Sequence, residues 1–510
     1  MVAESKIPES IKKYVPCKCC RIRKDGDTYR VYKYKSVKSS VTGKWTSDGG
    51  ILIGKIIEDK GFIPNKRYLK EFAQVNTSEA TNIFDDSITD VSYGSYALIK
   101  FLSEDILGRL EKYFGQEQGT QIYCYGLIMC VNGFTYIDQI DDYYQESFMS
   151  VIFKNFSFKM GYTALSTLLR ELGKKGNRVK AFEQSLIDES SKSIAIDGHV
   201  IRSCSEENDL AEPGYKMNLL KSEQVNLLVA YDTKNNAPLL YRTFRGSSID
   251  KKSVIELLES RKFSDTKFIV DRGFYSKTVL NMMSSNGNSY IIPVTSKNSD
   301  FVRIKENLQY TSGEFIYSSG RKECARVVFY EEKISETQRM IIFKDLDENN
   351  SNRKSFLKCM DENEKGYTTE KYNEVCEYWG VLAIETNVSS PAHEIYNDYK
   401  NRWSIETFNN YIKNDAHFNN LKIQDYYIQH GFDFIMLITG MLHSKLNEAV
   451  KNLGKSNIST FDILLKAGHM RMIKQDKIWK LCNTRKKDLE LLEKINFVPD
   501  PQLTINSIYC

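Results

Sequence analysis

Residues 193–198 read SIAIDG, a short apolar run that ends at Asp197 and Gly198. The stretch TKFIVDRGFYS at 266–276 repeats this arrangement, with an apolar run that ends at Asp271 and a glycine two residues later. Carboxylates at strand ends are predicted to lie at the carboxyl edge of an α/β sheet, where ligand sites form. Two such carboxylates repel each other unless a cation lies between them. Mg²⁺ meets that need, because it prefers carboxylate and phosphate oxygens.

The sequence around these two aspartates predicts a mixed α/β sheet. Strand-like runs at 224–232 and 237–244 follow the first aspartate, and helical stretches at 249–262 and 277–287 flank the strand before Asp271. A further strand is expected at 289–294. The short links allow the first three strands to be antiparallel, and the longer ones make the later strands parallel.

The stretch YKNRWSIETFNNYIK at 399–413 is predicted to be a helix with two different sides. Its core-facing residues are Ile405, Phe408 and Ile412. Its polar residues fall within about 60° of one another on a helical wheel, and they are Tyr399, Arg402, Glu406 and Lys413. A solvated surface helix has the same pattern. Glu406 on a packed helix could also complete a two-metal site that acts on a phosphodiester.

Length and composition indicate an ordinary globular protein of two to four structural units. The chain has 510 residues, of which 41% are hydrophobic and 27% charged. The start lacks the apolar run of a signal peptide, and the apolar segment 432–442 is interrupted by Asp433, so we expect a buried helix there. Eleven cysteines without a secretory signal favour reduced thiols. We therefore expect an intracellular protein with reduced thiols.

Positive charge is concentrated at the N-terminus. Residues 1–75 hold 17 Lys or Arg and 8 Asp or Glu, whereas the whole chain carries a net charge of only +5. Strand-like alternation at 27–57 places tyrosines among lysines, which predicts a small basic β unit. Such a unit can contact phosphate backbones, and a solvated sheet face is the alternative.

The remaining pattern divides the chain into further predicted regions. Residues 300–378 contain short β-like pieces between two core elements, followed by one more strand at 380–387. The predicted regions are a basic β-rich unit at 1–75, a helical region at 76–190, a catalytic core at 191–299 plus 380–445, a β-rich insertion at 300–379, and a helical C-terminal region at 446–510.

The helix at 399–413 resembles the Tyr-x2-Arg-x3-Glu-x6-Lys signature of the insertion-sequence-four superfamily of DDE transposases, which it matches without a gap. DRGFY at 271–275 is similar to the family's motif around the second carboxylate, and AIDGH at 195–199 fits the first. The long insertion before the third carboxylate also resembles the family. The resemblance covers roughly 191–445.

The resemblance implies an α/β fold with an RNase H-like catalytic core, in which Asp197, Asp271 and Glu406 are catalytic metal ligands. It implies Mg²⁺, with Mn²⁺ as a substitute, and cut-and-paste cleavage and joining of double-stranded DNA by a homodimer. It also implies a cytoplasmic, nucleoid-associated protein of prokaryotic type. The residues implied to contact DNA are Tyr399, Arg402, Lys413 and Trp379. Tyr378 and Trp403 are further candidates for stacking on a flipped base, although ordinary packing explains any of these aromatics.

Two other functions remain open from the sequence. A catalytically silent descendant would bind DNA without cutting it. A metal-dependent phosphoesterase for RNA or small phosphates would leave Arg402, Lys413 and the insertion unexplained. Metal-dependent nicking of DNA that disappears in Asp271→Asn separates the first of these from a transposase.

Overall fold

The computed structural model divides the chain into two compact units, residues 1–87 and 88–510. It describes residues 7–504 apart from 17–19, 27, 35, 39–44, 48–49, 59, 66–67, 69–89, 134, 175, 204–207, 215–222, 249, 310, 319–323, 413–422, 424, 455–457 and 476–477. Among the helices in this described part, none is long and apolar enough to cross a bilayer.

The N-terminal unit is a small antiparallel sheet with a helix on one face. Its strands lie in the order β1-β2-β5-β6, and β3 and β4 form a separate hairpin. The elements are α1 (Glu9–Lys12), β1 (Cys20–Asp25), β2 (Thr28–Lys33), β3 (Ser36–Lys38), β4 (Trp45–Ser47), β5 (Ile51–Ile57) and β6 (Gly61–Pro64). Ile11 of α1 packs with Val31, Ile53 and Ile56 of the sheet, so one face forms a core.

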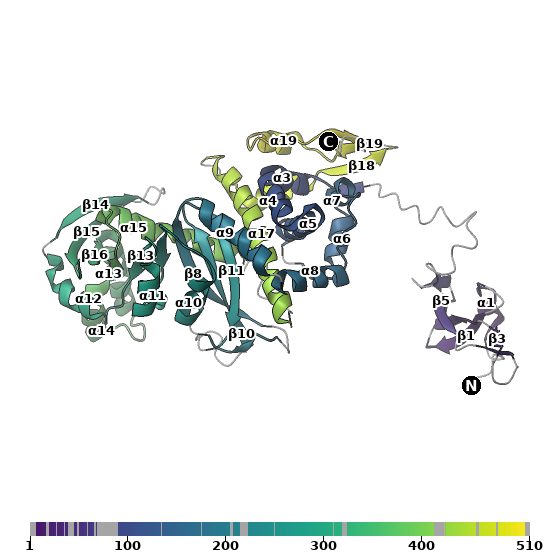
Figure 1. Ribbon diagram of the computed structural model, residues 1–510, viewed down its shortest axis with the longest axis horizontal. Coiled ribbons are helices and arrows are strands. Elements are labelled where there is room, and N and C mark those ends of the chain that lie inside the picture. Colours follow the sequence, from purple (N-terminus) through teal and green to yellow (C-terminus); the bar gives the residue numbers. More distant parts are fainter. Residues whose placement is uncertain are drawn as a thin grey trace. The chain divides into compact units, whose positions relative to one another are not determined.

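The larger unit is built on a sheet of ten described strands with helices around it (Figure 1). The strands follow the order β11-β10-β8-β12-β13-β17-β16-β15-β14, and β9 (Glu212–Pro213) pairs with β10. Their bounds are β8 (Ser193–Arg202), β10 (Glu223–Asp232), β11 (Ala237–Arg245), β12 (Lys267–Val270), β13 (Ser289–Pro293), β14 (Gly313–Ser318), β15 (Cys324–Lys333), β16 (Arg339–Asp345) and β17 (Val381–Thr386).

The strand directions confirm the predicted mixed sheet. Strand β10 is antiparallel to both β8 and β11, whereas β12 is parallel to β8 and β13. Two helices, α10 (Asp250–Ser260) and α11 (Lys277–Met283), make the crossovers. Nine of the ten residues of β10 are buried, because the strand lies between two neighbours and is covered on both faces.

The predicted insertion at 300–379 is joined to the core sheet. Strands β14, β15 and β16 continue that sheet through β17, so the insertion does not form a separate sheet. Helices and turns make up the rest: α12 (Ser299–Ile304), η5 (Lys305–Gln309), α13 (Leu346–Asp361), α14 (Thr369–Val375) and η6 (Cys376–Tyr378). The insertion is therefore less purely β than its sequence suggests.

A bundle of helices packs beside β11, around the long helix α17 (Figure 1). It comprises α3 (Gly94–Leu102), α4 (Glu104–Phe114), α5 (Gln116–Asn132), α6 (Ile140–Gln145), α7 (Phe148–Ile152), α8 (Tyr162–Lys174), α9 (Gly176–Glu189) and α17 (Tyr426–Lys451). The apolar run 432–442 lies inside α17 and is buried, as predicted. Its interrupting Asp433 accepts hydrogen bonds from Thr243 N (2.9 Å) and Thr243 Oγ1 (2.6 Å), which tie α17 to β11.

The C-terminal region corrects the helical prediction for 446–510. After α18 (Thr460–Gly468) the chain forms β18 (Arg471–Gln475), β19 (Ile478–Cys482), α19 (Lys486–Glu493) and β20 (Gln502–Thr504). Strand β18 pairs with β7 (Asp90–Ser92), which lies about 380 residues earlier. The strands are short and their partners distant in sequence, so periodicity within the segment does not reveal them.

Candidate active site

Asp197 and Asp271 occupy equivalent positions on adjacent parallel strands. Val270, the last residue of β12, pairs with Ile196 of β8, so the next residue on each strand is one of the two aspartates. Neighbouring strands lie about 4.8 Å apart. The register therefore brings the two predicted aspartates side by side.

The prediction that Asp197 ends its strand is wrong, because β8 continues to Arg202. Strand β10 pairs with β8 from Ile194 to Arg202, so hydrogen bonds on that side extend the strand past the aspartate. On the other side β12 ends at Val270, which leaves Asp197 at the point where β8 loses one neighbour. Gly198 permits close packing here, since a Cβ at this position would lie 2.7 Å from Leu228 Cδ2.

The DRGFY motif fixes the loop that follows β12. Asp271 caps a short 3₁₀ turn (η4, Arg272–Phe274) by accepting a hydrogen bond from Arg272 N at 2.8 Å. Phe274 is buried in the core, and Tyr275 donates to Glu385 of β17 at 2.7 Å. The aromatic residues of the motif thus hold the loop in place, and Asp271 remains half-buried.

The predicted single helix at 399–413 is two helices that meet at Arg402. Helix α15 runs over Ala392–Asn401 and α16 over Trp403–Asn410. The tight turn between them contains a hydrogen bond from Arg402 N to Tyr399 O at 3.1 Å. The three apolar residues of the predicted core face are nonetheless buried, and they are Ile405, Phe408 and Ile412.

Helix α16 is wedged between the sheet and α17, which positions Glu406. The ring of Phe408 lies 5.2 Å from that of Tyr231 and 6.1 Å from that of Tyr241. The other side of the Phe408 ring contacts α17, where a Cβ at Gly440 would lie 2.7 Å from Phe408 Cζ. These contacts leave Glu406 half-buried on the side of the helix that carries the site.

Arg402 is the cation that the described residues place at the site. Its guanidinium lies 2.5 Å from Glu406 Oε1, and the side chain as a whole is 12% exposed. It also lies over the ring of Tyr399, 5.4 Å from the centroid. Burial disfavours the charge of Arg402, but the nearby Tyr399, Glu406, Asp197 and Asp271 together raise its pKa.

Neighbouring charged groups act on the pKa of Asp197 in both directions. Burial raises the pKa of Asp197, and Arg402 and the Gly198 backbone N–H oppose this rise. The negative charges of Glu406 and Asp271 raise the pKa of Asp197 further. Like charges of this kind need a cation, and in this structure the guanidinium supplies it.

Asn409 is a site residue that the sequence reasoning missed. It is 4% exposed, and its Nδ2 donates to Asp197 Oδ2 at 2.8 Å, while its buried Oδ1 has no hydrogen-bond partner among the residues that the structure describes. It lies three residues after Glu406, so helical periodicity places both on one side of α16. This three-residue spacing from Glu406 is the feature of the sequence from which Asn409 could have been predicted as a site residue.

The other predicted contact residues are more dispersed. Lys413 lies outside the described residues. Trp379 lies at the end of the insertion, with its ring 5.5 Å from Phe356 and 5.3 Å from Tyr372. Tyr378 and Trp403 are exposed, the latter at 69%.

The donor chemistry suits a divalent cation, but the arrangement is not that of a formed metal centre. Among the described residues, no three His, Cys, Asp or Glu side chains are grouped so that they could hold a metal ion. Glu406 is paired with Arg402. A metal would require the carboxylates to move together and the guanidinium to release Glu406.

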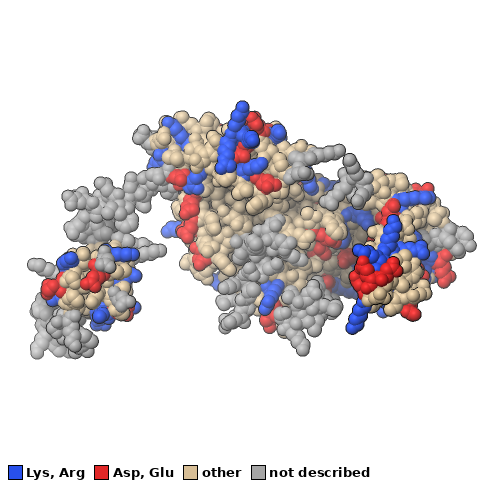
Figure 2. All heavy atoms as spheres, turned by 180° about the vertical axis from the view of Figure 1, so that it is seen from behind, with Lys and Arg blue, Asp and Glu red and all other residues tan. Residues whose placement is uncertain are grey.

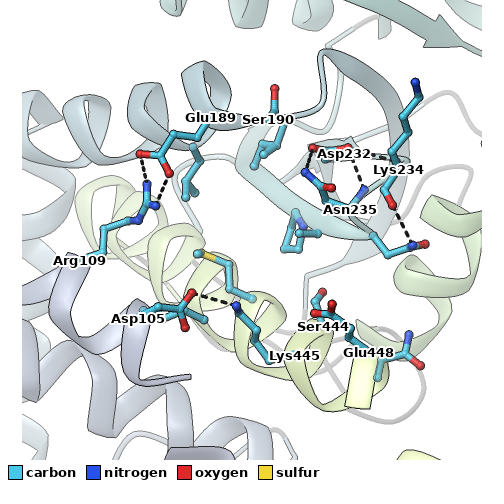
Figure 3. Close-up of a pocket in the computed structure, with 18 of the residues that line it drawn as sticks. Asp105, Arg109, Glu189, Ser190, Asp232, Lys234, Asn235, Ser444, Lys445 and Glu448 are labelled. Atoms are coloured by element: carbon cyan, nitrogen blue, oxygen red, sulfur yellow. Dashed lines mark hydrogen bonds and ion pairs between the residues drawn. The ribbon is translucent and has the colours of Figure 1, made fainter. Parts of the chain in front are cut away.

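A cavity of about 560 Å³ lies elsewhere, at the turn between β10 and β11 (Figure 3). Its charged side chains are largely paired: Arg109 with Glu189, and Lys445 with Asp105 at 2.9 Å. Asp232 accepts hydrogen bonds within the turn, from Asn235 among others. The cavity contains none of the predicted site residues.

Comparison with known proteins gives a family match and a similarity to solved structures. Residues 189–440 match the family model of the transposase DDE domain. The chain is similar to the piggyBac transposase in a cryo-EM structure of its synaptic complex with hairpin DNA, at 12% identity and a TM-score of 0.37, over 74% of this chain and 80% of that one. No curated protein sequence matches the chain. The family match contains the three carboxylates and supports a DDE transposase.

Proposed function

We propose that this chain is a DNA transposase, starting from the match of residues 189–440 to the transposase DDE domain. The observation that carries the proposal is the side-by-side placement of Asp197 and Asp271 next to α16, the helix that carries Glu406 and whose Asn409 donates to Asp197 at 2.8 Å. The five strands β11-β10-β8-β12-β13 support an RNase H-like core. The proposed reaction is cut-and-paste cleavage of transposon ends and their joining to target DNA.

Asp197, Asp271 and Glu406 would hold Mg²⁺, with Mn²⁺ as a substitute. When bound, the metal activates water or a DNA 3′-hydroxyl and stabilises charge on the leaving oxygen. Asn409 keeps Asp197 oriented from α16, and the DRGFY loop keeps Asp271 beside it.

Arg402 has two partners in this proposal. In the structure it neutralises Glu406, and with DNA it would bind a phosphate, for which a planar guanidinium is well suited. Transfer of Arg402 from Glu406 to a phosphate would free the third carboxylate for the metal. Tyr399 would assist through its hydroxyl, and Lys413 and Trp379 remain proposed DNA contacts.

Nicking of supercoiled plasmid by the full chain, with and without Mg²⁺, tests this function. Asp271→Asn keeps the hydrogen bond to Arg272 N but removes the charge, so we expect a folded protein that does not nick. The matched control is Asp265→Asn, because Asp265 is exposed and lies just before β12. Nicking that is unaffected by Asp271→Asn would refute the proposed active site.

The ion pair between Arg402 and Glu406 favours one second candidate, a silent DNA-binding descendant. Such a protein would retain the ion pair when it binds DNA and would not gain affinity for metal. Duplex binding without nicking at any Mg²⁺ or Mn²⁺ concentration would support it. The homodimer is a separate part of the proposal. Analytical ultracentrifugation of the chain with DNA that carries a transposon end tests it.

A further inference from the structure

The open face of the N-terminal sheet carries a row of cations. The opposite face packs on α1. Side chains alternate between faces along a strand, and Arg21, Arg23 and Lys55 are exposed. Arg23 of β1 is directly opposite Arg30 of β2, and Arg30 is opposite Lys55 of β5. Three cations therefore lie in line across three neighbouring strands.

This row is unfavourable for the isolated sheet. Like charges directly opposite one another on adjacent strands destabilise their pairing. Only Arg30 has a carboxylate partner among the described ion pairs, Asp25 at 2.6 Å. A bound anion would relieve the remaining repulsion, so the row points to an anionic partner.

Two of the arginines are held against aromatic rings. The guanidinium of Arg21 lies 4.6 Å from the ring centroid of Tyr34, and that of Arg23 lies 5.3 Å from the ring of Tyr32. Tyr34 is in turn confined by Gly50, where a Cβ would lie 2.8 Å from the ring. Stacking limits the orientations of a guanidinium and leaves its N–H edge free, so less entropy is lost when a phosphate binds.

We propose that this face, defined by Arg21, Arg23, Arg30 and Lys55, binds the phosphate backbone of duplex DNA. Strands are spaced at about 4.8 Å, so the row Arg23–Arg30–Lys55 spans about 10 Å. Phosphates of one DNA strand advance about 3.4 Å each along the helix axis. Lys and Arg on the visible surface of the unit are shown in Figure 2. The inference rests on the proposed function, because it assigns a second DNA contact to the same protein.

The salt dependence of duplex binding by the full chain tests this face. Each phosphate contact contributes about 0.9 to the slope of log affinity against log salt. The triple variant Arg21→Ala, Arg23→Ala and Lys55→Ala leaves the Arg30–Asp25 pair intact, and we expect its slope to be smaller by about 2 to 3. The control triple replaces Lys12, Lys24 and Lys60 by Ala, which removes the same charge from exposed positions of the same unit. We expect its slope to stay near that of the parent.

A variant that strengthens binding guards against loss of folding as an explanation. Asp25→Asn removes the carboxylate that competes for Arg30. We expect tighter binding and a slope larger by about 1, as one more cation meets a phosphate. Equal slopes for the two triple variants, or weaker binding by Asp25→Asn, would overturn the inference.

Two further measurements separate this inference from its alternatives. Plasmid nicking at saturating protein reports on the active site, so intact nicking with equal slopes refutes the face and leaves the proposed function standing. If DNA binding depends on Arg21, Arg23 and Lys55 but no nicking occurs, the inference about this face stands and the proposed catalytic function is refuted. Binding to anionic phospholipid vesicles that depends on Arg21, Arg23 and Lys55, without such dependence for DNA, would also refute the proposal.

Discussion

Replacement of Asn409 by Ala is expected to weaken metal binding by the carboxylates. Asn409 Nδ2 donates to Asp197 Oδ2 at 2.8 Å from a buried position, so the change removes one hydrogen bond to a charged group. Such bonds contribute about 1.5–3 kcal/mol, which corresponds to roughly 10- to 100-fold in affinity. Loss of a hydrogen bond that supports a metal-ligating carboxylate typically has an effect of this size.

Paramagnetic resonance of free Mn²⁺, titrated with the full chain bound to duplex DNA and corrected for the Mn²⁺ that DNA alone binds, measures this effect directly, because DNA is proposed to draw Arg402 away from Glu406. The Mn²⁺ midpoint for plasmid nicking should shift by the same factor. Asn410→Ala is the matched control, because Asn410 is the next residue of α16 and is exposed. Helix α16 should remain in place in both variants, since Phe408 and Ile405 are untouched, and denaturant unfolding checks this. Equal Mn²⁺ affinities for the two variants would refute the role of Asn409.

Three further predictions concern the stability of the larger unit, measured by denaturant unfolding. Burial favours the neutral form of Asp433, but hydrogen bonds from His430 and Thr243 hold its pKa below the ordinary value. The contribution of Asp433 to the free energy of unfolding is therefore complete above about pH 5 and declines as pH falls through the pKa of the folded state. Asp433→Asn should lower the free energy of unfolding at neutral pH and make it depend less on pH below pH 5. Glu183→Ala leaves the buried guanidinium of Arg261 unpaired and should cost about 3–5 kcal/mol, whereas the double variant with Arg261→Met should recover much of that loss. Gly431→Ala should be strongly destabilising, because its Cβ would lie 1.9 Å from Leu169 O, and unchanged stability would contradict the close packing of α17 on α8.

The sequence predicted the strands around the two aspartates well, for a physical reason. Apolar runs such as QVNLLVAYD are buried on both faces of the sheet, so their composition reports the strand directly. The burial of Ile405, Phe408 and Ile412 followed from helical periodicity in the same way.

Two of the features that were missed depend on partners distant in sequence, and two others are local. The length of β8 beyond Asp197 is set by its pairing with β10, and the C-terminal strands exist because β7 is available to β18. The turn at Arg402 interrupts a sequence that has ordinary helical periodicity on both sides. Asn409 could have been identified from its spacing to Glu406, but a lone buried amide has no chemical signature of its own.

The continuity of the sheet through β17 has a consequence for the engineering of this protein. Tyr396 of α15 packs against Phe315, Tyr317 and Phe343, which all belong to strands inside residues 300–379. Residues 300–379, which separate Asp271 from Glu406 in sequence, therefore form the surface against which α15 packs. Its excision would expose the edge of β17 and remove that support, so a minimal catalytic fragment must retain these strands. The exposed residues 362–366, between α13 and α14, are the better place for a tag or a fused domain.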